Sequence, residues 1–437
     1  MSSGLALEMQ RVHGGRWKRY PAYKDSGVGW LGDVPEHWGV NRLKFLFQFL
    51  DNCRIPVAAE DRAVMAKIYP YYGASGIIDH VEDYIFDESL ILVAEDGANL
   101  LSRSTPLAFI ANGKYWVNNH AHILRPISGQ IIFWEGVLQT YEYEPLVTGA
   151  AQPKLTKENL GSILLPRPTV EEQRAIAAFL NHETGRIDAL IAKKARQIEI
   201  LREKRAALIS HVVTKGLDPD VPMKDAGVEW LGEVPVGWDI FRAKFVFSIP
   251  NGQVDPKSRK YRNLTLIAPN HVDSGTGKII YAESAEEQQA ESGKYTFCKG
   301  DVLYSKIRPH LRKACLPEIK YGLCSADMYP LRPKKTTNSR YLLYVLLSDY
   351  FTNFAVNESM RVAMPKINRE DLSDCYFALP KFEEQHAITT LLDRETASID
   401  ALVEKVEASI ATLREYLTAL ISAAVTGKID VREELVS

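Results

Sequence analysis

Residue groups that could catalyse a reaction are incomplete in this 437-residue sequence. Amino-methyltransferases use an Asn/Asp-Pro-Pro-aromatic motif, but the sequence contains no Pro-Pro pair. The segment SGTGKII at 274–280 lacks the first Gly of a phosphate-binding loop and the Ser or Thr after its Lys, which favours a hairpin turn. Glu318 and Lys320 resemble part of a nuclease site, but no suitably placed Asp precedes them. These patterns predict a chain that is not an enzyme.

Candidate metal ligands are also sparse. His120 and His122 would share one face of a strand, where both could bind a metal ion, but no third ligand lies nearby. The five cysteines are an odd number without a Cys-x-x-Cys pair, which argues against a disulfide framework and against a zinc ribbon. We therefore expect neither a metal nor a cofactor in this chain.

The clearest candidate for binding chemistry is the basic segment KGDVLYSKIRPHLRKA at 299–314. A loop after a strand that presents Arg and His among Lys residues suits base reading by Arg and phosphate contacts by the others. The alternative is a solvated basic loop. The candidate DNA contacts in this segment are Lys306, Arg308, His310, Arg312 and Lys313. A second cluster, which favours phosphate contacts, consists of Lys257, Arg259, Lys260 and Arg262.

Residues 48–153 carry six Lys/Arg and thirteen Asp/Glu, whereas residues 248–365 carry seventeen and eleven. The acidic balance of the first segment favours neutral readers, because Asn can pair with adenine without net charge. The candidates there are Tyr71, Tyr72, Ser75, Arg103, Asn118, Asn119, His120 and His122. A structural turn is the alternative for the segment YYGASG. Lys154 and Lys366 precede the two helical runs described next and are candidate phosphate anchors or helix-start residues.

Two long helical runs position these segments. The first opens at Glu171 and continues to about Lys215, with a heptad seam of apolar residues, and residues 383–427 repeat it. Aligned from Lys154 and Lys366, 28 of 65 positions are identical, which indicates an internal duplication. Residues 170–215 hold nine Lys/Arg and six Asp/Glu, and residues 382–427 hold three and eight. Opposite charge favours pairing of the two helices within one chain over two unrelated solvated helices.

The duplication includes a leading segment. Residues 23–47 and 223–247 are identical at 14 of 25 positions, and both keep two Trp residues around a turn, which predicts indole packing. The middle segments of the two copies, 48–153 and 248–365, share no visible similarity. Both contain short strand-like runs and a late helical stretch, near 131–142 and 339–355. The predicted fold class is α+β, with two α+β recognition domains separated by two long helices that form an antiparallel coiled coil.

These features resemble the specificity subunit of type I restriction-modification enzymes. The resemblance rests on TGAAQPKLTKENLGSILLPRPTVEEQRAIAAFL before the first helix, PKINREDLSDCYFALPKFEEQHAITTLL before the second, and the leading segment YKDSGVGWLGDVPEHW. It covers essentially the whole chain. The second copy departs from the first in having Met364 for Gln152 and Val362 for Ala150. The expected domains are a loosely ordered segment 1–22, target-recognition domain 1 at 23–165, a long helix at 166–218, target-recognition domain 2 at 219–379, and a long helix with a tail at 380–437.

The resemblance implies a DNA-binding protein without catalysis of its own. Each recognition domain would read one half of a bipartite asymmetric site in double-stranded DNA, and the helices would set the spacer and dock two methyltransferase subunits. Restriction/translocase subunits would join that core. S-adenosylmethionine, ATP and Mg²⁺ would be used by the partner subunits and not by this chain.

Two other functions are compatible with the residues alone: a coiled-coil adaptor whose globular parts bind proteins, and a fragment of a single-chain restriction-modification enzyme. The sequence has no run of 18 apolar residues and no secretory signal at its start, from which we expect a cytoplasmic protein and no membrane partner.

Overall fold

The computed structural model describes residues 17–149, 152–359 and 365–434. Most of the predicted segment 1–22, together with Ala150, Val362 and Met364, lies outside the described residues. The chain divides into two compact units. The first unit contains the described residues up to 194 and those from 408 onward, and the second unit contains residues 195–407. No helix in the described part is long and apolar enough to cross a membrane.

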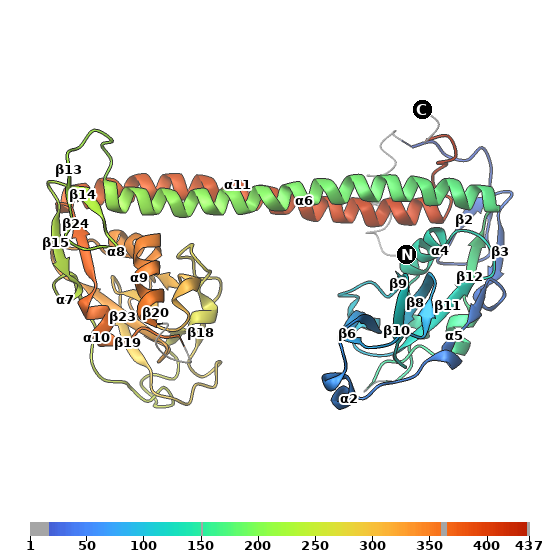
Figure 1. Cartoon of the computed structure of the whole chain (residues 1–437), viewed down its shortest axis with the longest axis horizontal. Coiled ribbons are helices and arrows are strands. Elements are labelled where there is room, and N and C mark those ends of the chain that lie inside the picture. Colours follow the sequence, from blue (N-terminus) through green and yellow to red (C-terminus); the bar gives the residue numbers. More distant parts are fainter. Residues whose placement is uncertain (1–16, 150–151, 360–364, 435–437) are drawn as a thin grey trace. The chain divides into compact units, whose positions relative to one another are not determined.

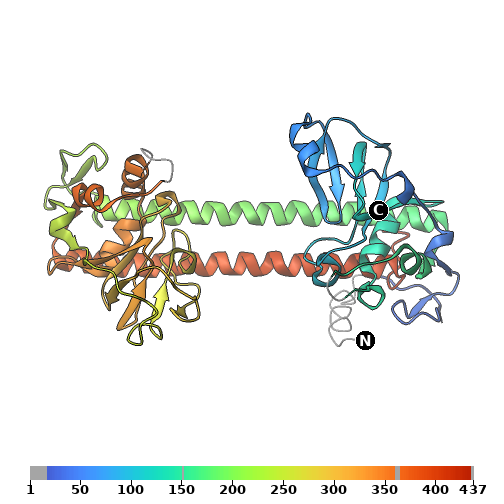
Figure 2. The same ribbon diagram turned by 90° about the horizontal axis from the view of Figure 1, so that it is seen from below.

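The two long helices are α6 (Val170–Lys215) and α11 (Phe382–Val425), each running through both units. In the first unit the beginning of α6 packs against the end of α11, with Leu180 and Val425 in one core. In the second unit the end of α6 packs against the beginning of α11, with Val213 and Leu392 in one core. The helices therefore pair antiparallel in each unit, as predicted, and lie side by side in both views (Figures 1 and 2).

Opposite charges meet along this pair. The Arg202 Nη2 atom lies 3.2 Å from Glu407 Oε1, and Arg205 Nε lies 3.1 Å from Asp400 Oδ1. The first pair is exposed and stabilises the helices little, because water screens it. The apolar seam contributes more, since it removes side chains such as Ile187 and Ile399 from water.

The rest of the first unit surrounds two four-stranded sheets, of order β4-β11-β8-β9 and β6-β5-β10-β7. Helix α4 lies between the first sheet and the helix pair (Figure 1), with Gly136 close to Leu180 and Val425. The elements are β1 (Tyr23–Asp25), β2 (Asp33–Pro35), β3 (Gly39–Arg42), η1 (Leu43–Phe45), β4 (Phe47–Phe49), η2 (Asp51–Cys53), α2 (Ala59–Val64), β5 (Tyr69–Gly73), β6 (Gly76–Val81), β7 (Phe86–Asp87), β8 (Leu90–Ala94), α3 (Asn99–Ser102), β9 (Ala108–Ala111), β10 (Lys114–Val117), β11 (Ala121–Pro126), α4 (Ile131–Thr140), η3 (Glu144–Leu146), α5 (Lys157–Ser162) and β12 (Leu164–Arg167).

The second unit has two four-stranded sheets of order β16-β23-β20-β21 and β18-β17-β22-β19. Its elements are β13 (Met223–Asp225), β14 (Glu233–Pro235), β15 (Asp239–Arg242), α7 (Ala243–Val246), β16 (Phe247–Ser248), β17 (Thr265–Ile267), η4 (Pro269–His271), β18 (Glu283–Ser284), β19 (Tyr295–Cys298), β20 (Val302–Ser305), η5 (Pro309–Leu311), β21 (Ala314–Cys315), β22 (Tyr321–Cys324), β23 (Met328–Pro333), α8 (Ser339–Leu347), α9 (Asp349–Ser359), α10 (Arg369–Asp374) and β24 (Tyr376–Leu379).

The two middles share one topology although their sequences are unlike. Strands β4, β11, β8 and β9 correspond in order to β16, β23, β20 and β21. The other sheet contains one parallel pair in each unit, β5 with β10 and β17 with β22. A buried strand needs apolar side chains but no particular ones, so the two middles can share a topology although their residues differ. The duplication therefore extends through the whole unit.

The repeated Pro-x-x-x-Glu-Gln motif has a structural function. In the first unit Gln173 Nε2 donates to the Pro168 carbonyl over 3.3 Å, and its Oε1 accepts from the Gln130 N–H over 3.2 Å. Gln385 makes the same two bonds to Pro380 and to the Asn338 N–H, over 2.9 and 2.8 Å. Gln130 and Asn338 are the N-cap residues of α4 and α8. The motif thus joins the start of each long helix to the start of the helix packed beneath it.

Candidate nucleic-acid interface

The predicted basic loop follows β20 in the second unit and contains η5. Arg308 and Arg312 flank η5 in the left-handed region, with φ of 50° and 48°. A non-Gly residue in this region costs free energy that the surrounding structure must offset. The side chains of Arg308 and His310 are exposed and have no hydrogen bond or ion pair among the described residues. Lys306 also lacks a side-chain hydrogen bond or ion pair there, and its ammonium group contacts only an aromatic ring.

Two other cations of the loop, Arg312 and Lys313, are engaged within the unit. Arg312 Nη2 lies 2.6 Å from Asp349 Oδ1, and Lys313 Nζ donates to the Pro269 carbonyl over 2.7 Å. Lys306 Nζ lies 5.4 Å from the centre of the Tyr329 ring. Arg312 and Lys313 therefore hold the loop against its own unit, which the sequence alone did not indicate.

The second basic cluster lies in turns between β16 and β17. Arg259, Lys260 and Arg262 are all exposed, and Lys260 Nζ lies 5.0 Å from the Tyr261 ring centre. No ion pair holds these three side chains within the part of the chain that the structure describes, whereas Lys257 Nζ lies 3.1 Å from Glu291 Oε1. Their position fits the phosphate contacts predicted for them, which remain a prediction.

In the first unit the predicted YYGASG segment forms the end of β5 and the turn to β6. The Tyr71 side chain is buried, and its hydroxyl accepts a hydrogen bond from the Val57 N–H over 3.0 Å. Tyr72 is half-buried and stacks on Phe109, and burial raises the pKa of its hydroxyl. Ser75 alone among the three predicted readers is exposed, at the tip of the turn.

Arg103 lies apart from these residues, in the loop between α3 and β9. Its backbone is left-handed, with φ of 48°, and its Nη2 donates to the Gln139 carbonyl over 2.7 Å. That bond ties the loop to α4.

The Asn-Asn-His segment follows β10. The Asn118 side chain is buried, and its Oδ1 accepts from the His120 N–H over 2.8 Å, which fixes the turn. Asn119 and His120 are exposed, and His120 Nδ1 lies 2.8 Å from Asp96 Oδ2. Asn119 is the asparagine that remains accessible to a base.

His122 does not share a face with His120. It is buried in β11, with Nδ1 2.8 Å from Asp51 Oδ2 and Nε2 2.8 Å from the Leu155 carbonyl. The expectation that both imidazoles face one site is wrong, because His120 precedes the strand and the alternation of strand faces does not reach it. No group of three or more His, Cys, Asp or Glu that could hold a metal occurs in the described ranges.

Sequence reasoning missed the carboxylates around His122. Burial alone would raise the pKa of Asp51, but hydrogen bonds from His122 and the Ile123 N–H hold that pKa below its usual value. Burial likewise opposes ionisation of Glu95, yet a hydrogen bond from Arg54 and the nearby His122 hold the pKa of Glu95 low. The only sequence signal is Glu-Asp directly after an apolar strand, and its partners lie tens of residues away.

The junction lysines sit at equivalent places before the long helices. Lys154 Nζ lies 3.2 Å from Glu95 Oε1, so this lysine is ion-paired. Lys366 is exposed and has no ion pair among the described residues. Neither lysine starts a helix: α5 and α10 begin after the N-cap residues Thr156 and Asn368.

Two segments weighed for catalysis have structural roles. The SGTGKII segment is a hairpin, as predicted, in which the Asp273 N–H donates to the Lys278 carbonyl over 2.9 Å. Glu318 pairs with Lys299 over 2.9 Å, which lowers the pKa of the carboxyl.

Comparison with known proteins identifies the family. Residues 35–200 and 235–411 match the family described as type I restriction modification DNA specificity domain. The chain is 26% identical over 413 residues to the specificity subunit of the type I restriction enzyme EcoDI from Escherichia coli, covering 91% of this chain and 90% of that protein. It is 23% identical over 432 residues to the type I restriction enzyme MjaVIII specificity subunit from Methanocaldococcus jannaschii, covering 91% and 94%.

A solved structure described as concerning complex assembly and conformational transition of the type I R-M system shares the fold. It aligns with a TM-score of 0.63 at 17% identity, over 90% of this chain and 98% of that chain. The resemblance inferred from the two Glu-Glu-Gln helix starts is therefore confirmed. Since the two matched regions span more than half of its residues, the chain belongs to the type I restriction modification DNA specificity family.

Proposed function

We propose that this chain is the DNA specificity subunit of a type I restriction-modification complex, and that each unit reads one half of a bipartite asymmetric site. The observation that carries this proposal is one topology built twice with unlike loop residues at corresponding places. Equal frames place two loops in equivalent positions, while different side chains on those loops select different bases. Loops that bound one protein partner twice would need like surfaces, and the loops of the two units are unlike.

Side-chain accessibility narrows the residues that read bases. Arg308 in the second unit and Asn119 in the first unit are exposed and lie in the loops that follow β20 and β10. Arg can bind guanine and Asn can bind adenine with two hydrogen bonds in the major groove. Tyr71, Asn118 and His122 are buried and support the loops from behind.

The helix pair is the proposed dock for two methyltransferase subunits. Leu190 on α6 and Leu402 on α11 occupy equivalent positions of the repeat, and both leave an apolar side chain exposed. Duplicated exposed leucines suit two copies of one partner, because each copy meets the same residues. Restriction/translocase subunits would join this core in the cytoplasm. The bound S-adenosylmethionine, ATP and Mg²⁺ would then belong to the partner subunits, and this chain would catalyse nothing alone.

Exchange of one middle segment tests the proposal. Residues 48–153 would be replaced by the corresponding segment of a related subunit, and methylated sites would be mapped in the DNA of cells that express the full system. One half of the methylated sequence should change and the other half should persist. A change in both halves, or in neither, would contradict independent reading by the two units.

A further inference from the structure

The loops that follow β8 and β20 correspond residue by residue. The Glu95 N–H donates to the His120 carbonyl and the Lys306 N–H to the Asp327 carbonyl, each over 2.9 Å. The Leu155 N–H donates to the Glu95 carbonyl, and the Ile367 N–H donates to the Lys306 carbonyl. These backbone bonds make Glu95 the counterpart of Lys306. They also make Lys154 the counterpart of Lys366, since each lysine directly precedes Leu155 or Ile367.

One more pair of bonds completes the correspondence. The Gly97 N–H donates to the Pro153 carbonyl over 3.1 Å, and the Arg308 N–H donates to the Pro365 carbonyl over 3.0 Å. Gly97 has a φ of 101° and Arg308 a φ of 50°, so both positions require positive φ. The same backbone frame thus carries Glu95, Gly97 and Lys154 in the first unit and Lys306, Arg308 and Lys366 in the second.

In the first unit, the charged side chains on this backbone frame are balanced by opposite charges within the protein. The buried Glu95 carboxylate receives Lys154 at 3.2 Å and a hydrogen bond from Arg54. Asp96 receives His120 at 2.8 Å, and Asp51 receives His122 at the same distance. A phosphate that approached Lys154 would compete with Glu95 and meet two further carboxylates, which repel it.

The second unit has no carboxylate at the position that corresponds to Glu95. Lys306 replaces Glu95, and its ammonium group shares the Tyr329 ring with the Arg369 guanidinium, 5.4 and 5.8 Å from the ring centre. Asp327, the counterpart of His120, is a carboxylate close by, but no ion pair joins it to Lys306 or Lys366 within the described ranges. Lys306 and Lys366 therefore have no ion pair within the described ranges, whereas the Arg369 guanidinium donates hydrogen bonds to the Ile249 and Pro250 carbonyls and to Asn251 Oδ1.

We propose that Lys306 and Lys366 form a phosphate-binding site through which the second unit anchors duplex DNA, and that Glu95 withholds Lys154 from the same contact in the first unit. This inference rests on the proposed function in DNA recognition. It assigns most of the affinity for the DNA phosphate backbone to the half-site that the second unit binds. The first half is then read mainly by neutral hydrogen-bonding groups.

The test compares two matched substitutions, Lys366→Gln and Lys154→Gln, which remove the same side chain from equivalent exposed positions. Each full-length variant would be purified with its methyltransferase partner and titrated, at several salt concentrations, with a duplex that carries the methylated sequence and with a scrambled duplex of equal length. Lys366→Gln should reduce the slope of log K against log salt by about 0.9, the value for one phosphate contact on duplex DNA. Lys154→Gln should leave that slope unchanged.

A third variant gives the second unit the carboxylate that the first unit has at Glu95. Lys306→Glu should pair with Lys366 and lower the slope by more than Lys366→Gln does, because two contacts are lost. Equal slopes for all variants, or a loss with Lys154→Gln as large as with Lys366→Gln, would overturn the inference. Failure of the wild-type complex to prefer the methylated sequence over the scrambled duplex would instead overturn the proposed function, so the two failures are distinguishable.

Discussion

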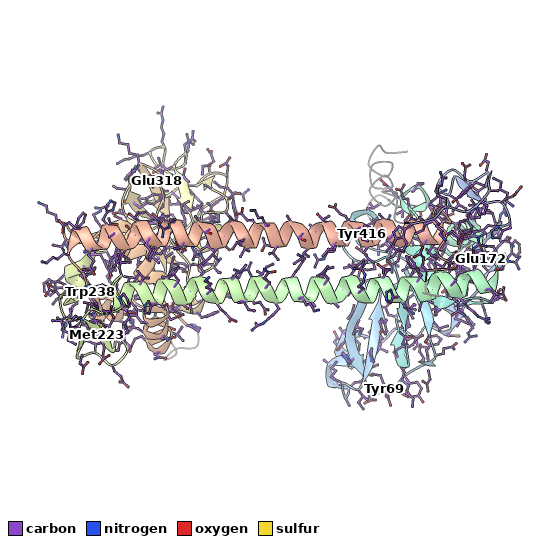
Figure 3. The ribbon with its side chains drawn as sticks, turned by 90° about the horizontal axis from the view of Figure 1, so that it is seen from above. Tyr69, Glu172, Met223, Trp238, Glu318 and Tyr416 are labelled. Atoms are coloured by element: carbon purple, nitrogen blue, oxygen red, sulfur yellow. The ribbon has the colours of Figure 1, made fainter. Side chains whose placement is uncertain are left out.

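The Trp238 indole Nε1 donates a hydrogen bond to Glu384 Oε1 over 3.0 Å. Trp238 lies at the end of the helix pair where α6 ends and α11 begins (Figure 3). Trp38 makes the same bond to Glu172 over 3.2 Å, although the chain order of the packed elements differs. In the second unit Trp238 packs near Gly216, just after the end of α6, whereas in the first unit Trp38 packs near Gly427, just after the end of α11. Each leading segment thus closes its unit by binding the start of one long helix and the end of the other.

Removing this indole should destabilise the first unit. Trp38 is fully buried, and Trp38→Ala should lower the free energy of unfolding by about 3–5 kcal/mol through the cavity it leaves. Trp38→Phe keeps much of the ring but loses the bond to Glu172, and should cost about 1–3 kcal/mol. Urea denaturation of both variants measures the difference. Equal losses would show that the hydrogen bond, and not packing, dominates this contact.

Arg308 should contribute to base recognition in the half-site read by the second unit. Arg308→Ala should weaken recognition of that half by about 1–3 kcal/mol if Arg308 binds a base with two hydrogen bonds. Arg308→Lys is the matched control, because Lys keeps the charge but lacks the planar fork. Methylation rates on duplexes altered in one half-site provide the measurement.

The outcome for the lysine variant separates two kinds of contact. Full activity of Arg308→Lys with unchanged sequence preference would mean that the residue meets a phosphate. Unchanged rates and sites in both variants would exclude this loop as the reader.

Acid should destabilise the first unit through Asp51 and Glu95. Their pKa values in the folded chain are lower than usual, so their contribution is fully present above the unfolded pKa values, near pH 4. It is lost as the pH falls further through the folded values, since the unfolded chain then binds more protons. The denaturation midpoint of the wild type should therefore fall as the pH is lowered from about 6 to about 3.

Substitution isolates that contribution. Asp51→Asn should reduce the change of stability with pH, because the group no longer titrates. Asp61→Asn, at an exposed position in α2, should keep the wild-type dependence. Identical pH dependence in Asp51→Asn and the wild type would exclude a role for this carboxylate.

Sequence patterns predicted the helices and strands closely, because their periodicity is a local property. The run from Glu171 became α6, and the apolar run before Glu95 became β8. The shared topology of the middles was not visible, since it depends on strand pairing between residues far apart. The same distance in sequence concealed the pairs of Lys154 with Glu95 and of Arg312 with Asp349. Candidate site residues were therefore chosen by type, and only the structure separates exposed Arg308 from buried His122.

The long helices should determine the spacing of the two half-sites. Adding four residues near Arg196 in α6, with a matching addition near Ala408 in α11, should lengthen the pair by about 6 Å. Four residues make slightly more than one helical turn, which a coiled coil accommodates with modest local unwinding. At about 3.4 Å per base pair, the unread spacer should grow by about two base pairs. Both half-sites should keep their sequence, because the additions touch no loop of either recognition unit.

Methylation mapping measures the spacing, and assembly with the methyltransferase subunit reports whether the variant has folded. A variant with the addition in α6 alone is the control, since its helices are no longer matched and its assembly should fail. A folded, active double variant that still methylates sites of the original spacing would show that the helices do not set the distance.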